Sequence, residues 1–242
     1  MPKLRNAATG MTLTEHLAEA RQRIMISLAA ILVFGTVAFI FYTHILNVLQ
    51  EPYCRATPKH CLFLVTAPLD GLTLRIKIAF FGGFVLSTPV LFWETWRFIT
   101  PGLKARERRY ALPFVLSSLL FFCGGVLLAY FIFQRAIAWL ESIGGHTLIY
   151  EYNPNQYLSL FVLMMVIFGL TFEFPVVLVA LELAGLVSPK TLLRGWRYAL
   201  ISITVFSAVI TPSSDPFSML ALAIPLAVFY FMAIGVGKLL KK

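Results

Sequence analysis

Six long apolar runs divide this chain, and they limit the folds open to it more than any other feature. Crossing the hydrocarbon core of a bilayer takes about 20 helical residues. A β-barrel would show alternating segments of about 10 residues in place of unbroken runs. The sequence therefore predicts an all-α integral membrane protein with six transmembrane helices. The six runs cover residues 24–42, 72–93, 110–133, 157–183, 198–210 and 217–236.

The composition indicates little mass outside the lipid. Apolar residues make up 59% of the 242 residues and charged residues only 13%, and the mean hydropathy is +0.83. A soluble domain carries more charge than this. The net charge of +9 first suggests nucleic acid, but in a membrane protein it more simply reflects orientation and attraction to anionic lipid. We therefore expect a lipid bilayer as the surroundings and no nucleic-acid partner.

The basic residues are shared unevenly between the two sides of the predicted bundle. Fifteen Lys and Arg residues lie in segments on the side of the two termini, and three lie in the loops opposite. Because cytoplasmic loops carry an excess of Lys and Arg, both termini are predicted to be cytoplasmic. Residues 1–23 would form a cytoplasmic segment with an amphipathic helix, residues 24–237 the single six-helix domain, and residues 238–242 a short basic tail.

The fifth apolar run is too short to cross a bilayer alone. Its 13 residues would rise about 20 Å as a helix, against a hydrocarbon core of about 30 Å. Either the bilayer thins there or the fifth and sixth helices pack as a short pair. Four prolines would bend the other runs; such bends are commonly tolerated kinks, but curved helices could also form a concave wall for a ligand. These prolines are Pro89, Pro113, Pro175 and Pro225.

Two acids near the cytoplasmic surface are candidates for binding a cation. Glu107 lies among the basic residues of the loop between the second and third runs, where a loop that only set orientation would need no acid. Glu19 lies on the helix before the first run, whereas Glu15 has a local role in a capping box with Thr12. Glu19 could pair with Arg23 at i, i+4, or it could hold its carboxylate ready for a ligand.

Glu173, near the middle of the fourth run, is the most costly residue in the sequence. An acid at the bilayer centre costs several kcal/mol unless it is neutral or paired. It could serve as a proton site, as the partner of a cation, or as an acceptor for a polar group on another subunit's helix. A protonated acid that only stabilises packing is the structural alternative.

Two alternative functions follow from these acids. One is a proton-coupled secondary transporter with Glu173 as its relay, although the sequence shows neither the paired repeats common in transporters nor a second buried charge in mid-span. The other is a purely structural scaffold, which would explain the basic loops but neither Glu107 nor Glu173. No HExxH, GxSxG, P-loop or histidine cluster is present. We therefore expect no enzyme, no catalytic residue, no cofactor and no metal site.

Other polar residues have local interpretations. Asp215, in the short link before the sixth run, is predicted to cap the sixth helix. Arg75 and Lys77 are predicted to anchor the second run at the membrane interface. Cys54 and Cys61, with six residues between them, would face an oxidising compartment, where a disulfide could join them.

Four stretches, in order along the chain, carry a family resemblance. They are LTEHLAEARQRI before the first run, FWETWRFITPGLKARERR between the second and third, GLTFEFPVV in the fourth and AIPLAVFY in the sixth. Together they resemble the TatC family, the large subunit of the twin-arginine (Sec-independent) protein translocase. The resemblance runs from about residue 13 to about residue 238, and it implies a cupped, concave six-helix bundle with short fifth and sixth helices.

The resemblance also implies a function. A TatC-like protein would be the receptor and core subunit of the translocase in the bacterial cytoplasmic (inner) membrane. It would bind the twin-arginine signal peptides of folded precursors at the cytoplasmic face. It would assemble, as a homo-oligomer within a multi-subunit complex, with TatA-type and TatB-type single-span subunits, and the proton-motive force would drive export.

The family's functional positions fall on residues already singled out. Its two signal-binding acids fall on Glu19 and Glu107, and its loop aromatic on Phe98. Its intramembrane acid falls on Glu173, near the partner-helix contact, and Thr211 is a further residue predicted for that contact. The remaining candidates are Pro52, Arg21, Arg108 and Asp215.

The chemistry of these residues agrees with the implied ligand. An arginine side chain ends in a planar fork that binds a carboxylate through two parallel hydrogen bonds. Two acids at one interface could therefore hold two consecutive guanidinium groups. A partly desolvated headgroup region strengthens such pairs relative to bulk water.

Overall fold

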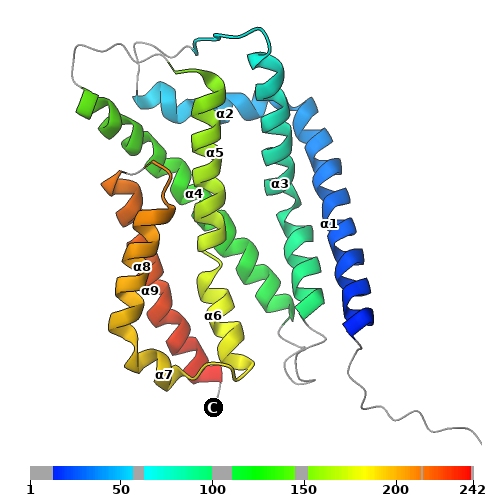
Figure 1. Ribbon diagram of the computed structural model, residues 1–242, viewed down its shortest axis with the longest axis vertical. Helices are drawn as coiled ribbons and strands as arrows, with labels where there is room; N and C mark the ends of the chain where they lie inside the picture. Colours follow the sequence, from blue (N-terminus) through cyan, green and yellow to red (C-terminus); the bar gives the residue numbers. More distant parts are fainter. Residues whose placement is uncertain (1–12, 57–62, 100–110, 145–151, 214, 241–242) are drawn as a thin grey trace, which may run out of the picture.

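The protein is described by a computed structural model that covers residues 13–56, 63–99, 111–144, 152–213 and 215–240 (Figure 1). Every regular element in these residues is an α-helix. Five segments are long and apolar enough to cross a membrane, and a sixth apolar helix is shorter. The predicted all-α membrane fold with six hydrophobic segments is therefore confirmed.

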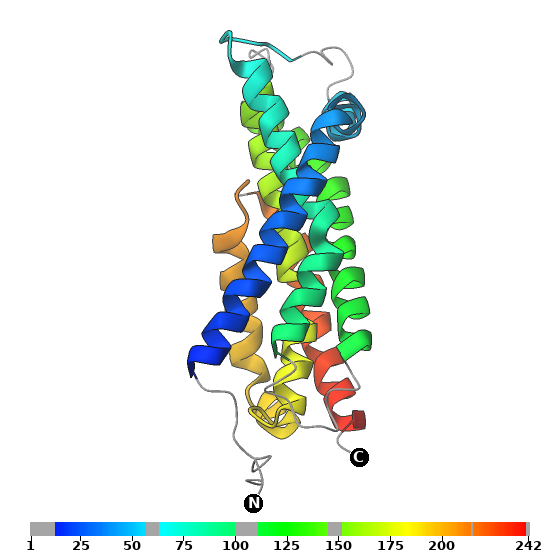
Figure 2. The same ribbon diagram turned by 90° about the vertical axis from the view of Figure 1, so that its right-hand side faces the viewer.

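The described helices form one bundle, and its two ends can be told apart by the helices that lie there. The start of α1 and the end of α9 lie at the same end (Figure 2), which we call the terminal end. The opposite end is crossed by α2 (Figure 1), and we call it the α2 end. The helices are α1 (Leu13–Ile40), α2 (Tyr42–Ala56), α3 (Asp70–Ile99), α4 (Ala111–Gly144), α5 (Pro154–Thr171), α6 (Phe174–Leu183), α7 (Pro189–Arg194), α8 (Trp196–Ile210) and α9 (Pro216–Leu240).

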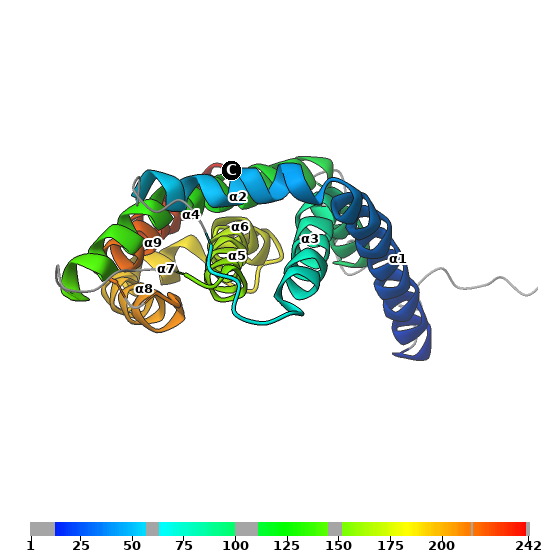
Figure 3. The ribbon, with the colours of Figure 1, turned by 90° about the horizontal axis from the view of Figure 1, so that it is seen from above.

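The helices stand around α5 and α6. Seen from above, α3 and α1 lie on one side of α5 and α8 lies on the other, while α4 passes behind (Figure 3). The helix α4 crosses the bundle obliquely rather than parallel to α5 (Figure 1). Because α1 and α8 project forward at the two sides, the bundle has the concave face that the family resemblance implied.

The first helix begins earlier than the first apolar run. The amphipathic segment and the run predicted after it form one continuous helix, α1, of 28 residues. No glycine or proline interrupts the sequence between residues 13 and 34, so nothing there favours a break. Thr12, predicted as part of a capping box, lies outside the described residues.

Two stretches that were predicted to be outer loops are helical. The helix α2 has 15 residues, and all but Tyr42 lie in the loop predicted between the first two runs. The helix α4 continues to Gly144, past the predicted end of the third run, and its 34 residues span about 51 Å. Hydropathy missed α2 because that helix is amphipathic: Leu49, Pro52 and Tyr53 are buried and most of its other residues are exposed.

Pro52 explains how α2 is attached to the bundle. A proline has no N–H, so it leaves the carbonyl four residues earlier without its helical donor. That carbonyl, of Val48, accepts a hydrogen bond from the Tyr130 hydroxyl of α4 at 3.0 Å. The Tyr130 hydroxyl also lies 3.1 Å from Glu51 Oε2. Both hydrogen bonds to Glu51 lower its pKa, the one from Arg55 more than the one from Tyr130.

The fourth apolar run forms two helices inside one candidate span. The helix α5 ends at Thr171 and α6 begins at Phe174, and residues 154–183 together are long enough to cross a membrane. Pro175 cannot donate a hydrogen bond to the Thr171 carbonyl, and its ring crowds the preceding turn. The bend predicted at Pro175 is therefore confirmed, and it falls beside Glu173.

The last two helices differ from the prediction in length. The helix α8 has 15 residues, or about 22 Å, so the short fifth helix is confirmed. The helix α9 has 25 residues, of which 24 form a candidate span, so the sixth helix is not short. The link between them nevertheless ends well before the α2 end (Figure 1). Asp215 caps α9 as predicted, since its Oδ1 accepts a hydrogen bond from Ser218 N at 2.7 Å.

Arg75 and Lys77 connect helices, which the sequence did not indicate. The Arg75 guanidinium carbon lies 4.3 Å from the centre of the Phe39 ring, which ties α3 to α1. The Lys77 ammonium donates to Ser159 Oγ at 2.7 Å and to the Asn155 carbonyl at 3.3 Å, which ties α3 to α5. Each cation thus joins two parts of the bundle in addition to its predicted role at the interface.

Glycine allows two pairs of helices to approach very closely. At Gly83 of α3, a Cβ atom would lie 2.6 Å from the backbone of Gly35 in α1. At Gly125 of α4, a Cβ atom would lie 2.5 Å from the carbonyl oxygen of Phe168 in α5. Both distances are shorter than any ordinary contact, so a larger residue would have to push the helices apart.

We expect Gly125→Ala to destabilise the protein by about 1–3 kcal/mol, because the added methyl group meets backbone that cannot rotate away. The adjacent substitution Gly124→Ala is a matched control, since a Cβ atom there has nothing within 4 Å. The measurement is thermal unfolding of each purified variant in detergent. Equal unfolding midpoints for the two variants would show that the close approach of α4 and α5 does not require a glycine at position 125.

Candidate functional site

The contact between α1 and α3 at the terminal end gathers several polar and aromatic side chains. His16, Glu19 and Arg23 follow one face of α1 at spacings of three and four residues. Glu94 and Phe98 follow one face of α3 at a spacing of four. We call these five residues the α1–α3 cluster.

Arg23 bridges two acids from different helices. Its Nη2 donates to Glu19 Oε1 at 3.0 Å, and its Nη1 donates to Glu94 Oε2 at 2.8 Å. The exposed fractions of the side chains are 17% for Arg23, 15% for Glu19 and 8% for Glu94. The three groups are therefore largely withdrawn from solvent, where an ion pair is stronger than at an open surface.

The cluster retains unused hydrogen-bonding capacity. Among the described residues, neither Glu19 Oε2 nor Arg23 Nε has a hydrogen-bond partner, although both atoms are buried. A buried polar atom without a partner costs about 1–3 kcal/mol. Two carboxylates and one guanidinium leave a net charge of −1. The arrangement can therefore accept one further cationic N–H donor at Glu19.

Aromatic stacking joins the first turns of α1 to the last turn of α3 in the same cluster. The rings of His16 and Phe98 stack with their centres 4.5 Å apart and their planes inclined by 16°. Phe98 is the penultimate residue of α3, so the helix ends directly beside the cluster.

The structure brings some of the predicted signal-site residues together. Glu19 and Phe98 both belong to the α1–α3 cluster, whereas Arg21 is exposed outside it. Glu107 and Arg108 lie outside the described residues. The loop that contains them begins directly after the end of α3 in the sequence.

Glu94 is the one charged member of the cluster that the sequence interpretation missed. The second apolar run ends near Trp93, so the sequence alone places Glu94 in the polar loop. In the structure α3 continues to Ile99, and Glu94 is 6% exposed. Its spacing of four from Phe98 was the available signal, because that spacing places both side chains on one helix face.

Glu173 lies at the break between α5 and α6, beside two cavities. It gives no side-chain cap to α6, and its Oε1 is buried with no hydrogen-bond partner in the described part of the chain. One cavity, of about 590 Å³, is a groove between α5, α6 and α8. The other, of about 340 Å³, lies between α3, α4 and α6. Glu173 lines both cavities, so the start of α6 separates them.

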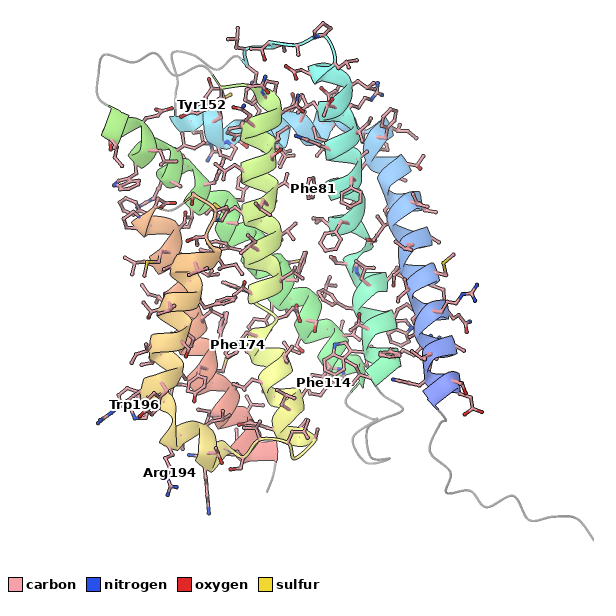
Figure 4. The ribbon with its side chains drawn as sticks, viewed as in Figure 1. Phe81, Phe114, Tyr152, Phe174, Arg194 and Trp196 are labelled. Carbon is pink, nitrogen blue, oxygen red and sulfur yellow. The ribbon has the colours of Figure 1, made fainter. Side chains whose placement is uncertain are left out.

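The groove beside α8 is mainly apolar. Its lining includes Leu170, Val177 and Phe206, and each of these side chains is between 45% and 52% exposed. Phe174 lies on the same side of α6, toward α8 (Figure 4). A hydrophobic segment that entered this groove would meet one acid, Glu173.

The other predicted positions have structural contacts. Thr211 is 3% exposed and donates to the Ser207 carbonyl at 2.8 Å; it does not line the groove with Glu173. Asp215 is 1% exposed, and its Oδ2 accepts a hydrogen bond from Ser213 in addition to the cap at Oδ1. The structure therefore does not place Thr211 and Glu173 in one cavity.

The cysteines fall into two classes. Cys54 is disulfide-bonded and Cys123 is free and exposed. Cys61 lies outside the described residues, so its pairing with Cys54 stays a prediction. Among the residues that the structure describes, no group of three or more His, Cys, Asp or Glu side chains could hold a metal ion.

Comparison with known families gives one match over most of the chain. The model of the family described as TatC, Sec-independent protein translocase protein, matches residues 15–225.

Two curated relatives are similar along almost the whole chain, and both are described as Sec-independent protein translocase protein TatC. The relative from Frankia casuarinae is 42% identical over 239 residues, and the match covers 94% of this chain and 65% of that protein. The relative from Aquifex aeolicus is 36% identical over 232 residues, and the match covers 95% of each protein. The chain thus spans slightly less than two thirds of the Frankia protein and nearly all of the Aquifex protein.

Two solved structures have the same fold. A crystal structure described as the twin-arginine translocase receptor TatC is 33% identical and superposes with a TM-score of 0.77, covering 94% of this chain and all of that one. A second, of the same receptor in DDM, is also 33% identical and gives a TM-score of 0.78, covering 92% of this chain and 99% of that one.

We expect alkylation of the unfolded protein to separate the cysteines. Without a reductant, iodoacetamide should modify only Cys123, because a Cys54–Cys61 disulfide would protect the other two. After reduction, all three cysteines should be modified, and mass spectrometry counts the added groups. Modification of all three cysteines without reduction would exclude the disulfide. Partial protection of Cys123 would show that Cys123 takes part in a disulfide in some of the molecules.

Proposed function

Because the chain belongs to the TatC family of Sec-independent protein translocase proteins, we propose that it is the receptor for twin-arginine signal peptides. It is a multi-pass membrane protein and a subunit of the twin-arginine translocase. In the proposal it binds the signal peptides of folded precursors at the cytoplasmic face, and it assembles with single-span subunits for export.

One observation carries the proposal of a binding site for arginine. Glu19 presents a buried carboxylate oxygen that lacks a hydrogen-bond partner among the described residues. It lies at the terminal end of the bundle, in a cluster with a net charge of −1. A guanidinium group supplies the missing N–H donors and neutralises the charge, which favours an arginine as the ligand.

Glu107 and Phe98 complete the proposed site. Phe98 lies beside the acids and stacks on His16, so it can border the ligand with an apolar ring. Glu107 belongs to the loop that follows α3 in the sequence, and it would receive the second guanidinium group. The basic residues around Glu107, including Arg108, would repel unspecific cations and contact lipid phosphate.

Three features support placing the terminal end in the cytoplasm. The segments at that end carry most of the Lys and Arg residues, and Arg194 and Trp196 point outward there (Figure 4), as interfacial residues do. Cys54, on α2, is disulfide-bonded, which is typical of an oxidising compartment. In the proposal the α2 end therefore faces away from the cytoplasm.

Glu173 is proposed to contact a single-span partner of the TatA or TatB type. The groove that it borders has a volume of about 590 Å³ and a mainly apolar lining, of which Leu170 and Val177 are about half exposed. A partner helix with one polar group could bury its apolar face there and hydrogen-bond to Glu173 Oε1. Thr211 would stabilise the end of α8 that forms one wall of this groove.

The same surroundings favour a partner contact over proton transport. A relay needs a chain of polar groups or waters on both sides of the acid. Both cavities beside Glu173 are lined mainly by apolar side chains, with Ser118 and Thr95 on one side and Ser202 and Thr171 on the other. We therefore keep the transporter as the weaker alternative.

We expect a twin-arginine signal peptide to crosslink to this protein in membranes, and a peptide with two lysines to crosslink far less. Glu19→Ala and Glu107→Ala should each reduce crosslinking by at least about tenfold, since each removes a charge-assisted hydrogen bond. The measurement is photo-crosslinking from a residue next to the two arginines. Glu15→Ala is the control, because Glu15 lies on the same helix outside the α1–α3 cluster. Equal crosslinking of both peptides would refute the receptor function.

We expect a photoreactive residue at Val177 to capture a TatA-type or TatB-type subunit, because Val177 lines the groove and is 52% exposed. Glu173→Gln should reduce this capture severalfold by weakening the polar contact. A photoreactive residue at Leu120 of α4, which is 75% exposed, is the control for lipid-facing positions. Proton flux through liposomes that contain this chain alone would instead favour the transporter.

A further inference from the structure

The α1–α3 cluster already contains an arginine at the position where the proposed function requires a ligand arginine. Resting on that function, we propose that Arg23 is an internal occupant of Glu19 that the signal arginine must displace. In this scheme Glu94 is a positioning residue: it holds Arg23 both before and after the exchange. The two residues would then set the selectivity of the receptor for arginine over lysine.

The geometry allows Arg23 to be displaced from one acid while it stays bound to the other. Its two terminal nitrogens are divided between the acids, with Nη2 on Glu19 and Nη1 on Glu94. The Glu94 side chain is 8% exposed and lies deeper than Glu19, which is 15% exposed. A ligand arriving from the surface would therefore reach Glu19 first.

The hydrogen-bond geometry at Glu19 favours displacement of Arg23 by the ligand arginine over binding of the ligand beside Arg23. Within the described part of the chain, Glu19 Oε2 has no partner while Arg23 holds Oε1, so an incoming guanidinium could not bind both oxygens of Glu19 through two parallel hydrogen bonds. If Arg23 turns wholly to Glu94, both oxygens of Glu19 become available for a two-fold interaction with the ligand. Without Glu94, the displaced Arg23 would be a largely covered cation that had lost both of its acids, which is unfavourable.

The internal arginine also explains how lysine could be rejected. A lysine ammonium carries its charge at one point and cannot match a carboxylate with two parallel hydrogen bonds. It would have to compete with the Arg23 guanidinium for Glu19 while forming a weaker contact itself. Without Arg23, Glu19 would bind either an arginine or a lysine of the ligand. In this proposal the preference for arginine therefore depends on Arg23.

The test is equilibrium binding of fluorescent peptides to the full-length protein in lipid nanodiscs. One peptide carries two arginines and its partner carries two lysines at the same positions. The variants are Glu94→Gln, Arg23→Gln and the double variant, with Glu15→Gln as a matched control for loss of one acid from the same end. Thermal unfolding of each sample verifies that it is folded, and Arg23→Met, which keeps an unbranched apolar stem without the cation, replaces Arg23→Gln if the latter does not fold.

We expect Glu94→Gln to weaken binding of the twin-arginine peptide on the order of tenfold, because Arg23 then stays on Glu19. Arg23→Gln should bind both peptides more tightly than the unmodified chain and should discriminate between them less. The double variant should recover the affinity lost in Glu94→Gln, since no internal arginine remains to be held. Glu15→Gln should behave like the unmodified chain.

Other outcomes separate this proposal from the receptor function itself. If the double variant binds as weakly as Glu94→Gln, Glu94 contacts the ligand directly and the internal-occupant proposal is wrong. The proposal is also wrong if Arg23→Gln keeps the full preference for arginine. If the unmodified chain binds both peptides equally, the receptor function fails, whatever the variants do.

Discussion

The close crossing of α1 and α3 determines where the polar residues of the terminal end can meet. Gly35 and Gly83 let the two backbones touch at the last turns of α1 and near the middle of α3. From that point the helices run side by side to the terminal end, where Arg23 reaches Glu94 and Phe98 reaches His16. A wider crossing would lengthen both contacts, because side chains of fixed length could no longer bridge the helices. The charged cluster therefore depends on two residues that carry no side chain and lie outside it.

Proline shapes the other half of the molecule by removing single hydrogen-bond donors. At Pro52 the freed carbonyl of Val48 is used by Tyr130, and α2 becomes attached to α4. At Pro175 the helix breaks, and Glu173 is left beside two cavities rather than inside a regular helix. The missing proline N–H thus leads to a tertiary contact at Pro52 and to a helix break beside a partly buried acid at Pro175.

The sequence predicted the spans well because hydropathy reports directly on lipid contact. It also predicted the cap at Asp215, and it singled out Glu19 and Glu173, whose functional roles stay predictions; Phe98 was indicated by the family resemblance alone. It missed α2, since an amphipathic helix lying across the bundle has no long apolar run. It missed Glu94 and the inward contacts of Lys77 because their partners lie 71 to 82 residues away in the sequence. Such partners depend on which helices become neighbours, and local patterns do not encode that.

The short α8 has a mechanical consequence for the surrounding lipid. Its length of about 22 Å is roughly 8 Å less than the hydrocarbon core of an ordinary bilayer. Each ångström of such a mismatch costs a fraction of a kcal/mol, so a bilayer of ordinary thickness that thinned to match α8 would be compressed there at a cost of a few kcal/mol. That cost would be met before any substrate arrived. A polar chain crossing next to α8 would therefore start from a membrane already partly deformed, and the barrier that it meets would be lower there than elsewhere around the bundle.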